Sequence, residues 1–484
     1  MVAPNKLFIL YKKNIPILLF EQDKDEYIVA IKKIFNLRHL PVHLFTNGVA
    51  SAENEYGLCQ KLEEFFNNRM IPYSRREFRT ILSELELESN EELARKSYYL
   101  SLSDQYWICN VADMGKIWWE DINFFTNEYD EAIGLRLMSA SKALNKHSNS
   151  ISPDNTTNGE LPKRWVRKNG KNFLEKAGTG TEQQEPLNEV LASEICRRFK
   201  INYVPYELEI KNEQYYCLCP DMVDENTELV PMESVYQGIA LNNGKYDFEK
   251  LIERCDFLKI PNAEIDILKI ILLDFIIANE DRHSNNIAFL RDAETLEWLG
   301  LAPVYDSGKS MFLNKMDFEM DEQTSEGINS KPFEENQAAQ FASLPMEKLH
   351  DLLDFSALNT VQDWYKKFLS PLRRLSEDKK SALVKKLGER IFEAQNLLEK
   401  KYLESLLAAG KISEKPSEKA KNLVLKQLRE NPRRNKEELA LILGLSRATI
   451  TRALQALVKE SEIKRVGSNK TGYWELIGGG QKLN

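Results

Sequence analysis

Hydrophobic residues recur along the 484-residue chain with two periods, and the changes of period divide it into predicted segments. Short apolar runs at 6–11 and 15–21, "KLFILY" and "IPILLFE", flank a turn and predict two strands. Helical spacing follows at 55–70. An aromatic-rich stretch over 100–125 is typical of a packed core. We therefore predict an N-terminal subdomain of helices and strands over residues 1–140.

A second mixed region begins with a polar loop. Residues 145–165 are dense in Ser, Asn, Thr, Pro and Gly, a composition that predicts a loop. Strand-like runs at 171–177 and 214–219 then enclose an amphipathic helix over 186–199. Strand, helix and strand in this order predict a small lobe over residues 141–235 that covers a nucleotide.

Helical patterns dominate from residue 236 to residue 410. The apolar run 267–278, "ILKIILLDFIIA", is followed directly by the polar run 279–286, "NEDRHSNN". A long amphipathic stretch over 376–409 completes a mostly helical large lobe. Residues 411–416 carry charge and a proline but little to bury, so they predict a linker.

The C-terminal segment, 417–484, carries the clearest fold signal. A helix over 435–444 and a second over 447–460, capped by Ser446, precede an alternating stretch at 463–476. This pattern predicts a winged helix-turn-helix. The start of its second helix would enter a DNA major groove, and basic residues beside the wing suit DNA phosphates. The residues expected to contact DNA are Arg447, Thr449, Thr451 and Arg452 on the helix and Arg465 and Lys470 at the wing.

The composition narrows the class of protein. Apolar residues make up 42% of the chain, enough to bury several cores, yet charges interrupt its long apolar runs, as Asp274 interrupts 267–278. We therefore expect a soluble protein without a membrane partner. Six cysteines are sparse for this length, which favours reduced thiols and a cytoplasmic location.

The net charge of −8 is unevenly distributed along the chain. Residues 417–476 hold 13 Lys and Arg against 7 Asp and Glu, a local charge of +6, so the remainder carries −14. A basic tail on an acidic body indicates a separate partner for the tail, and DNA is the first candidate. A winged helix that serves protein contacts or dimerisation is the alternative.

The polar run 279–286 has the residue types and spacing of a phosphoryl-transfer loop. Asp281 precedes Asn286 by five residues, as a catalytic Asp precedes a metal-binding Asn in protein kinases, and Asp306 follows 20 residues after Asn286. Upstream, Lys176 at the end of a strand is a candidate to contact the phosphates of a nucleotide. Glu189 on the next helix is the best candidate to form an ion pair with Lys176.

Two other interpretations of this run compete. Asn and Asp side chains cap themselves in ordinary loops, so the run alone could be structural. A zinc site would require three or four His or Cys ligands, but the other histidines lie in unrelated segments and no cysteine is near. The presence of Lys176 and Asp306 at suitable positions in the same chain favours kinase chemistry. In such a site His283 could support Asp281 or contact the phosphates.

These residues resemble the HipA-like serine/threonine kinases of bacterial toxin–antitoxin systems. The resemblance covers roughly residues 150–400 and rests on "DRHSNN", on the downstream "VYDSG" and on the loop segment "SISPDNTTNG". It implies an α+β fold with two kinase-like lobes, between the N-terminal subdomain and the winged helix, and a Mg-ATP-dependent activity. It assigns Asp281 as catalytic with His283 beside it, Asn286 and Asp306 as Mg²⁺ ligands, and Lys176 as the ATP lysine.

The loop segment gains a role from this resemblance. In the family a serine-containing loop covers the nucleotide phosphates, and its autophosphorylation ejects the loop and inactivates the kinase. A phosphorylated side chain cannot share a pocket with the phosphates of ATP, because both carry negative charge. Ser150 and Ser152 are the matching candidates, and Ser152 would also lie near ATP. Met222 or Val223, after the last strand of the small lobe, could contact adenine.

The expected partners follow from the same resemblance. Family substrates include aminoacyl-tRNA synthetases, so an enzyme of this kind or another translation protein is a candidate substrate. Operator DNA and a small antitoxin protein are candidate partners as well. The alternative function belongs to another class: a DNA-binding transcriptional regulator whose kinase-like body is a nucleotide sensor or scaffold.

Overall fold

The computed structural model describes most of the chain. Its described ranges are 5–45, 55–75, 77–138, 151–159, 161–409, 416–443, 445–467 and 472–477. The expectations for Ser150 and Lys470, and for the linker apart from Pro416, therefore fall outside the described residues.

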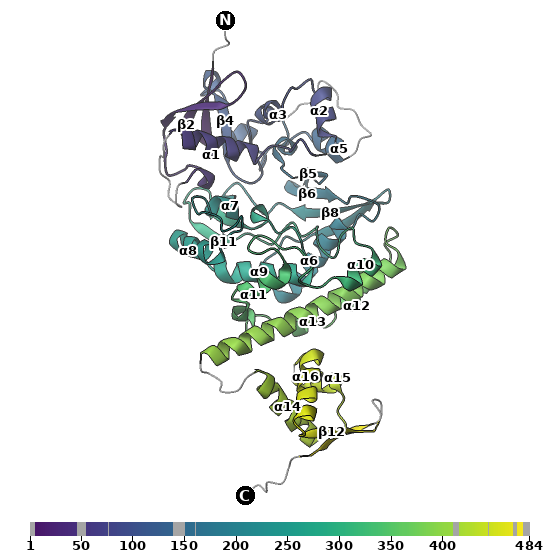
Figure 1. Cartoon of the computed structure of the whole chain (residues 1–484). Coiled ribbons are helices and arrows are strands. Elements are labelled where there is room, and N and C mark those ends of the chain that lie inside the picture. The colour runs from purple at the N-terminus through teal and green to yellow at the C-terminus, as the bar shows by residue number, and fades with distance from the viewer. Residues whose placement is uncertain are drawn as a thin grey trace.

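The N-terminal subdomain is built on an antiparallel sheet in the order β3-β2-β1-β4. Figure 1 shows this sheet, with β2 and β4 labelled, beside α1. The two strands predicted at its start are present and form a hairpin in which Leu10 lies opposite Leu18, both fully buried. Helix α1 packs against β3. The elements are β1 (Lys6–Lys12), β2 (Ile15–Gln22), β3 (Ile28–Ile34), α1 (Glu55–Asn67), α2 (Phe78–Glu84), α3 (Asn90–Lys96), β4 (Tyr106–Asn110), α4 (Trp119–Ile122) and α5 (Ala132–Met138).

The small lobe is a second antiparallel sheet, in the order β5-β6-β8-β7, with one helix against it. Leu187, Leu191 and Ile195 recur on one face of this helix and are fully buried, which explains why it packs there. A short 3-10 helix, η3 (Pro153–Thr156), precedes the sheet. The elements are β5 (Lys163–Lys168), β6 (Lys171–Ala177), α6 (Glu185–Phe199), β7 (Glu207–Lys211) and β8 (Gln214–Pro220).

The large lobe combines a small sheet, in the order β11-β10-β9, with many helices. Its central helix α9 is apolar on nearly all sides and almost wholly buried. The long helix α13 runs beneath the lobe (Figure 1). The elements are β9 (Thr227–Pro231), α7 (Met232–Val235), α8 (Phe248–Leu258), α9 (Ala263–Ile276), β10 (Ala288–Asp292), β11 (Trp298–Leu301), α10 (Asp317–Glu322), α11 (Gln337–Ser343), α12 (Val361–Leu369) and α13 (Glu377–Ala408).

The C-terminal unit is the winged helix that the sequence predicts. The Ser446 hydroxyl accepts the backbone N–H of Thr449 at 2.8 Å and so caps the second predicted helix. A further helix at the start of this unit had no counterpart in the sequence analysis. The elements are α14 (Pro416–Glu430), α15 (Lys436–Leu443), α16 (Arg447–Lys459), β12 (Ile463–Val466) and β13 (Tyr473–Leu476).

The described residues form two main hydrophobic cores, one that extends over several domains and one confined to the winged helix. One continuous core joins the N-terminal subdomain to both lobes, and includes Leu10, Leu191 and Leu268. The winged helix has its own core, which includes Val424 and Leu454. The predicted α+β fold class is confirmed, and the body up to α13 behaves as one packed unit to which the winged helix is added.

Two further properties bear on location and redox state. All six cysteines are buried free thiols. Among the described residues, no single helix has the length and apolar character to cross a membrane. Only α15 and α16 taken together, bent by 113°, meet the criteria of length and composition.

Candidate active site

Three predicted residues meet between the small and large lobes. The Lys176 ammonium on β6 lies 2.7 Å from Glu189 Oε1 on α6 and 2.8 Å from Asp306 Oδ1, which follows β11. The Tyr206 hydroxyl lies 3.2 Å from the same ammonium. The second Glu189 oxygen accepts the backbone N–H of Ser307 at 2.8 Å. The cluster therefore ties β6 and α6 of the small lobe to the segment that follows β11 of the large lobe.

The charges in this cluster stabilise one another. Burial alone would lower the pKa of Lys176, but the carboxylates of Asp306 and Glu189 raise it well above its usual value. Burial opposes ionisation of Asp306 too, yet Lys176 and Lys163 lower the pKa of that carboxyl. Asp306 also has a left-handed backbone, with φ of 56°. Such a conformation is costly for a non-glycine residue and is often found at functional sites.

A buried arginine fixes the backbone of the loop 279–286. Arg282 is 1% exposed, and its guanidinium holds both carboxylate oxygens of Asp274, each at 2.9 Å. It also donates to the backbone carbonyls of Asn286 at 3.2 Å and Tyr305 at 2.5 Å. The segments that carry Asn286 and Asp306 are therefore held side by side. The pair of Asp274 and Arg282 was not predicted, although an acidic residue within the apolar run 270–278 was a signal that a buried partner exists.

Asp281 lies at the open side of this loop. Its Oδ1 is 2.9 Å from the Lys331 ammonium and its Oδ2 is 3.0 Å from the Lys309 ammonium. Although burial favours the neutral acid, these lysines lower the pKa of Asp281. A cavity of about 230 Å³ lies beside the carboxylate, lined by Ala278, Glu280, Asp281, Lys309, Phe312, Leu313 and Asn314. The site thus presents an ionised carboxylate next to a space for a reacting group.

His283 and Asn286 are neighbours within the loop. The His283 ring nitrogen Nδ1 accepts the backbone N–H of Asn285 at 3.3 Å and caps the short 3-10 helix η4 (Ser284–Asn286). Burial lowers the pKa of His283, so its ring is neutral at pH 7. The Asn286 amide donates to the carbonyl of Asp281 at 3.2 Å. In this structure His283 supports the turn that carries Asn286, and no hydrogen bond joins its ring to the Asp281 carboxylate.

The segment 151–159 is anchored to the N-terminal subdomain. Ser152 is fully buried, and its backbone N–H donates to the Ser97 hydroxyl at 3.0 Å. The Arg75 guanidinium donates to the carbonyls of Gly159, at 2.8 Å, and Thr157. Arg75 is 2% exposed and has no ion pair among the described residues. Burial lowers its pKa to about 10. The segment is therefore held in place chiefly by contacts that the sequence analysis did not anticipate.

Lys163 is a site residue that the sequence analysis missed. It lies opposite Lys176 in the β5–β6 register. A Cβ atom at Gly159, whose φ is +100°, would come within 2.5 Å of the Lys163 ammonium. Burial lowers the pKa of Lys163 to about 7, against the opposing attraction of Asp306. Within the described part of the chain no hydrogen bond or ion pair holds this ammonium, so a bound anion would satisfy it.

The two residues expected at adenine lie in different surroundings. Met222 packs on a small apolar cluster with Leu174, Cys219 and Tyr305, on the face of the sheet that carries Lys176. Val223 is buried outside that cluster, and its backbone N–H donates to Asp221 Oδ1 at 3.1 Å. A cavity of about 290 Å³ lies close by, between Trp165, the segment 156–158, Asn285, Tyr305, β9 and the N-terminal subdomain.

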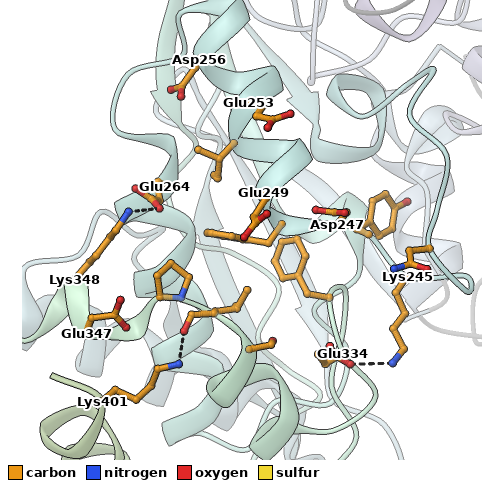
Figure 2. A pocket seen from close by; sticks show the side chains of 18 of the residues that line it. Lys245, Asp247, Glu249, Glu253, Asp256, Glu264, Glu334, Glu347, Lys348 and Lys401 are labelled. Atoms are coloured by element: carbon orange, nitrogen blue, oxygen red, sulfur yellow. Dashed lines mark hydrogen bonds and ion pairs between the residues drawn. The ribbon is translucent and has the colours of Figure 1, made fainter. Parts of the chain in front are cut away.

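A larger cavity lies away from these residues. It measures about 950 Å³ and is rimmed by acidic side chains of α8 and its neighbours (Figure 2). Its lysines are engaged: Lys348 pairs with Glu264, and Lys401 donates to the Leu344 carbonyl. None of the predicted catalytic or ATP-binding residues lines this cavity.

The predicted DNA-binding residues of the winged helix are only partly exposed. Arg447 and Arg452 at the start of α16 are exposed, although Arg447 pairs with Glu437 at 2.6 Å. The Thr449 hydroxyl accepts from Ser446 in the helix cap, and Thr451 is half-buried. Arg465 on β12 stacks over the Trp474 ring with 4.9 Å to its centroid. The two arginines of α16 are therefore the side chains best placed to reach a partner.

Comparisons with known proteins identify both parts of the chain. The model of the HipA-like C-terminal domain matches residues 139–386, just over half of the chain. The model of a winged helix-turn-helix DNA-binding domain matches residues 419–461. No curated protein matches the sequence.

Two solved structures are similar to parts of the chain. That of the Helicobacter pylori proinflammatory kinase CtkA is 14% identical, with 51% of this chain and 95% of that chain covered and a TM-score of 0.40. The structure of the Shewanella oneidensis MR-1 toxin–antitoxin complex of HipA, HipB and operator DNA is 14% identical. The match covers 82% of this chain and 99% of that chain, with a TM-score of 0.49.

Proposed function

The chain belongs to the HipA-like family, and from this premise we propose that it is a Mg-ATP-dependent serine/threonine protein kinase that binds DNA through its winged helix. The observation that carries the proposal is the contact of the buried Lys176 ammonium with both the buried Glu189 and the half-buried Asp306. A lysine held between a helix carboxylate and a metal-binding Asp is the arrangement that kinases use to position nucleotide phosphates.

The charges around Lys176 suit a polyanionic ligand. Lys163 and Arg75 are cations near the segment 157–159, and neither has a carboxylate in contact among the described residues. A buried or half-buried charge without a counter-ion is costly, and the phosphates of ATP would relieve that cost at the buried Arg75 and at the half-buried Lys163. We assign Met222 and the neighbouring apolar cluster to the adenine ring. Val223, which lies outside that cluster, stays a candidate through its backbone.

The donor set also suits a magnesium ion. Asp306 supplies a carboxylate and Asn286 an amide oxygen, and these are hard ligands that leave room for phosphate oxygens and water. Mg²⁺ bound there would neutralise charge on the phosphates. Arg282 holds the backbone of both ligand segments, so the two side chains start from a fixed separation.

The Asp281 carboxylate would bind the hydroxyl group of the acceptor serine or threonine. The acceptor oxygen forms a bond to the γ-phosphorus, while the bond from that phosphorus to the β,γ-bridging oxygen breaks and ADP leaves. The proton of the hydroxyl passes to the Asp281 carboxylate, which the neighbouring lysines keep ionised. His283 contributes by capping the turn that carries Asn286.

Autophosphorylation and partners complete the proposal. Ser152 is fully buried and its hydroxyl lies 3.4 Å from Asp154 Oδ2, so a phosphate on Ser152 would force the segment 151–159 from its place. Ser150 is the second candidate. A translation protein, such as an aminoacyl-tRNA synthetase, is the proposed class of substrate, and operator DNA and a small antitoxin protein are proposed partners in the cytoplasm.

The proposal is tested by phosphate transfer from labelled ATP with Mg²⁺, read by intact mass and by mapping of phosphate to Ser150 or Ser152. Asp281→Asn should lower the rate by at least 100-fold while nucleotide binding persists, because the acceptor loses its base and its orienting group. Asp306→Asn should lower both the rate and the Mg-dependent affinity for ATP.

Asp266→Asn is the matched control, because Asp266 also pairs with a lysine but lies outside the cluster. It should leave transfer unchanged. Binding of ATP by the wild-type chain without any transfer would instead favour the nucleotide sensor or scaffold, and equal transfer by Asp281→Asn would refute the catalytic assignment.

A further inference from the structure

Two lysines from distant segments hold the two carboxylate oxygens of Asp281. Lys309 follows Asp306 by three residues, and Lys331 belongs to the segment before α11. Their ammonium groups lie 3.0 Å and 2.9 Å from Oδ2 and Oδ1 respectively. The lysine side chains are 46% and 52% exposed, whereas that of Asp281 is 22% exposed. A pair of cations therefore stands on the solvent side of the carboxylate.

From this geometry, and resting on the proposed kinase function, we infer that Lys309 and Lys331 are positioning residues. They form a clamp that orients Asp281 toward an acceptor hydroxyl. With both oxygens held, the carboxylate cannot rotate freely, and its remaining lone pairs face a limited set of directions. In a loose phosphoryl-transfer transition state the acceptor hydroxyl has lost little of its proton. The orientation of the Asp281 carboxylate therefore matters more than its basicity.

The surroundings of the clamp indicate a protein segment as the acceptor. The cavity beside Asp281 is lined by Leu313 and by the buried side chains of Ala278 and Phe312 as well as by polar groups, so part of its wall is apolar. The chain continues from there to Met316 and Phe318, which are 65% and 71% exposed. Single exposed apolar side chains are ordinary on protein surfaces, but here two large ones lie two residues apart, directly after the segment that lines the cavity. A serine or threonine with an apolar neighbour in its own chain fits this combination.

The clamp also has a role at the moment of transfer. When Asp281 takes the proton, the two ammonium groups lose their anionic partner while the phosphorylated product appears beside them. A phosphoserine carries between one and two negative charges at neutral pH, so its formation next to two cations is favourable. The lysines thus exchange one anion for another during the reaction.

The test measures phosphate incorporation by the full-length chain into itself, as a function of ATP concentration, for Lys309→Met, Lys331→Met and the two Lys→Arg variants. We expect each Met variant to lower kcat by at least tenfold while KM for ATP changes by less than twofold. The Arg variants should restore most of the rate, because arginine keeps the charge and can donate to both the carboxylate and a phosphate.

Lys348→Met is the matched control, since Lys348 is 45% exposed and pairs with a single carboxylate at the rim of the acidic cavity (Figure 2). It should behave as wild type. Unchanged or increased kcat in both Met variants, with an active wild type, would overturn the clamp and leave the kinase proposal intact. A wild type that transfers no phosphate would overturn the proposed function, and the clamp with it.

Discussion

At the scale of single residues, the acidic and amide groups of the site follow a spacing that is visible in the sequence. Asp281, Asn286 and Asp306 share one continuous stretch, so their separation along the chain indicates their chemistry. Lys163, Lys309 and Lys331 carry no such signal, because lysine is common on surfaces and only the fold brings these three residues to the site. Cationic partners of an active site are therefore harder to predict from sequence than its acids.

The lowered pKa of Lys163 predicts that the proposed nucleotide binding depends on pH. Its pKa is lowered to about 7, so in the free protein the ammonium loses its proton as the pH rises above 7. The protonated form attracts phosphate, and binding therefore takes up a proton at higher pH. We expect the affinity for ATP to fall between pH 7 and pH 9, as measured by calorimetry in buffers of different ionisation enthalpy. Lys163→Met should bind ATP more weakly and remove this proton uptake.

Lys168→Met provides the comparison on the same strand. Lys168 is 42% exposed and pairs with Glu209 at the surface. The proton uptake of this variant should match that of wild type. An identical uptake in Lys163→Met would assign the titration to another group.

At the scale of elements, the segment 151–159 depends on a subdomain that precedes it in the chain. The Asn155 amide donates to the Ser97 hydroxyl at 2.6 Å, and the Thr156 hydroxyl donates to the Leu100 carbonyl. The Asn158 amide donates to the Asn68 carbonyl at 3.1 Å. A loop held by polar contacts at this many points has a defined position before any nucleotide binds, which lowers the cost of ordering it on binding.

Arg75→Ala should loosen this segment. The variant removes two hydrogen bonds from a charged donor to the loop carbonyls, each of which contributes about 1.5–3 kcal/mol. We expect KM for ATP to rise about tenfold, with a smaller change in kcat, and the midpoint of thermal unfolding to fall. Arg79→Ala, an exposed neighbour on α2, should change neither quantity. A KM that stays at the wild-type value would show that the loop holds its position without Arg75.

The elements were predictable where apolar residues form a run or recur at a regular spacing. Strands β1 and β2 are short apolar runs with successive buried residues, and helices α6 and α16 bury one face of regularly spaced apolar residues. Helix α14 was missed because few of its residues are apolar: Ala420, Val424 and Leu428 lie in the core with Leu425 packed against it, while charged and polar residues make up most of the rest. The anchoring of 151–159 was missed for another reason: its partners lie more than 50 residues away, and no local pattern records such contacts.

At the scale of the whole molecule, the two separate cores predict two unfolding events. Leu454→Ala removes a buried side chain from the core of the winged helix and should cost about 2–5 kcal/mol there. We expect calorimetry to show a lowered transition for the winged helix and an unchanged transition for the body. The same variant should lose affinity for DNA of its own promoter at low salt while it keeps phosphate transfer.

Ile271→Ala is the counterpart in the other core. It should lower the transition of the body and leave DNA binding near the wild-type value. A single transition that moves with either substitution would mean that the two units unfold together despite their separate cores.

Helix α13 contacts both the large lobe and the winged helix. Near its start, Lys379 donates to the carbonyl of Lys315 and Lys385 pairs with Asp321 at 2.7 Å, both in the stretch that follows the Asp281 cavity. Farther along it contacts α14 of the winged helix. With 32 residues it is about 48 Å long and stiff over that length. One helix therefore contacts both the segment that follows the Asp281 cavity and the winged helix. If α13 couples the proposed acceptor site to the winged helix, thermodynamics makes the effect reciprocal: whatever factor bound DNA imposes on the affinity for the acceptor, the acceptor imposes on the affinity for DNA.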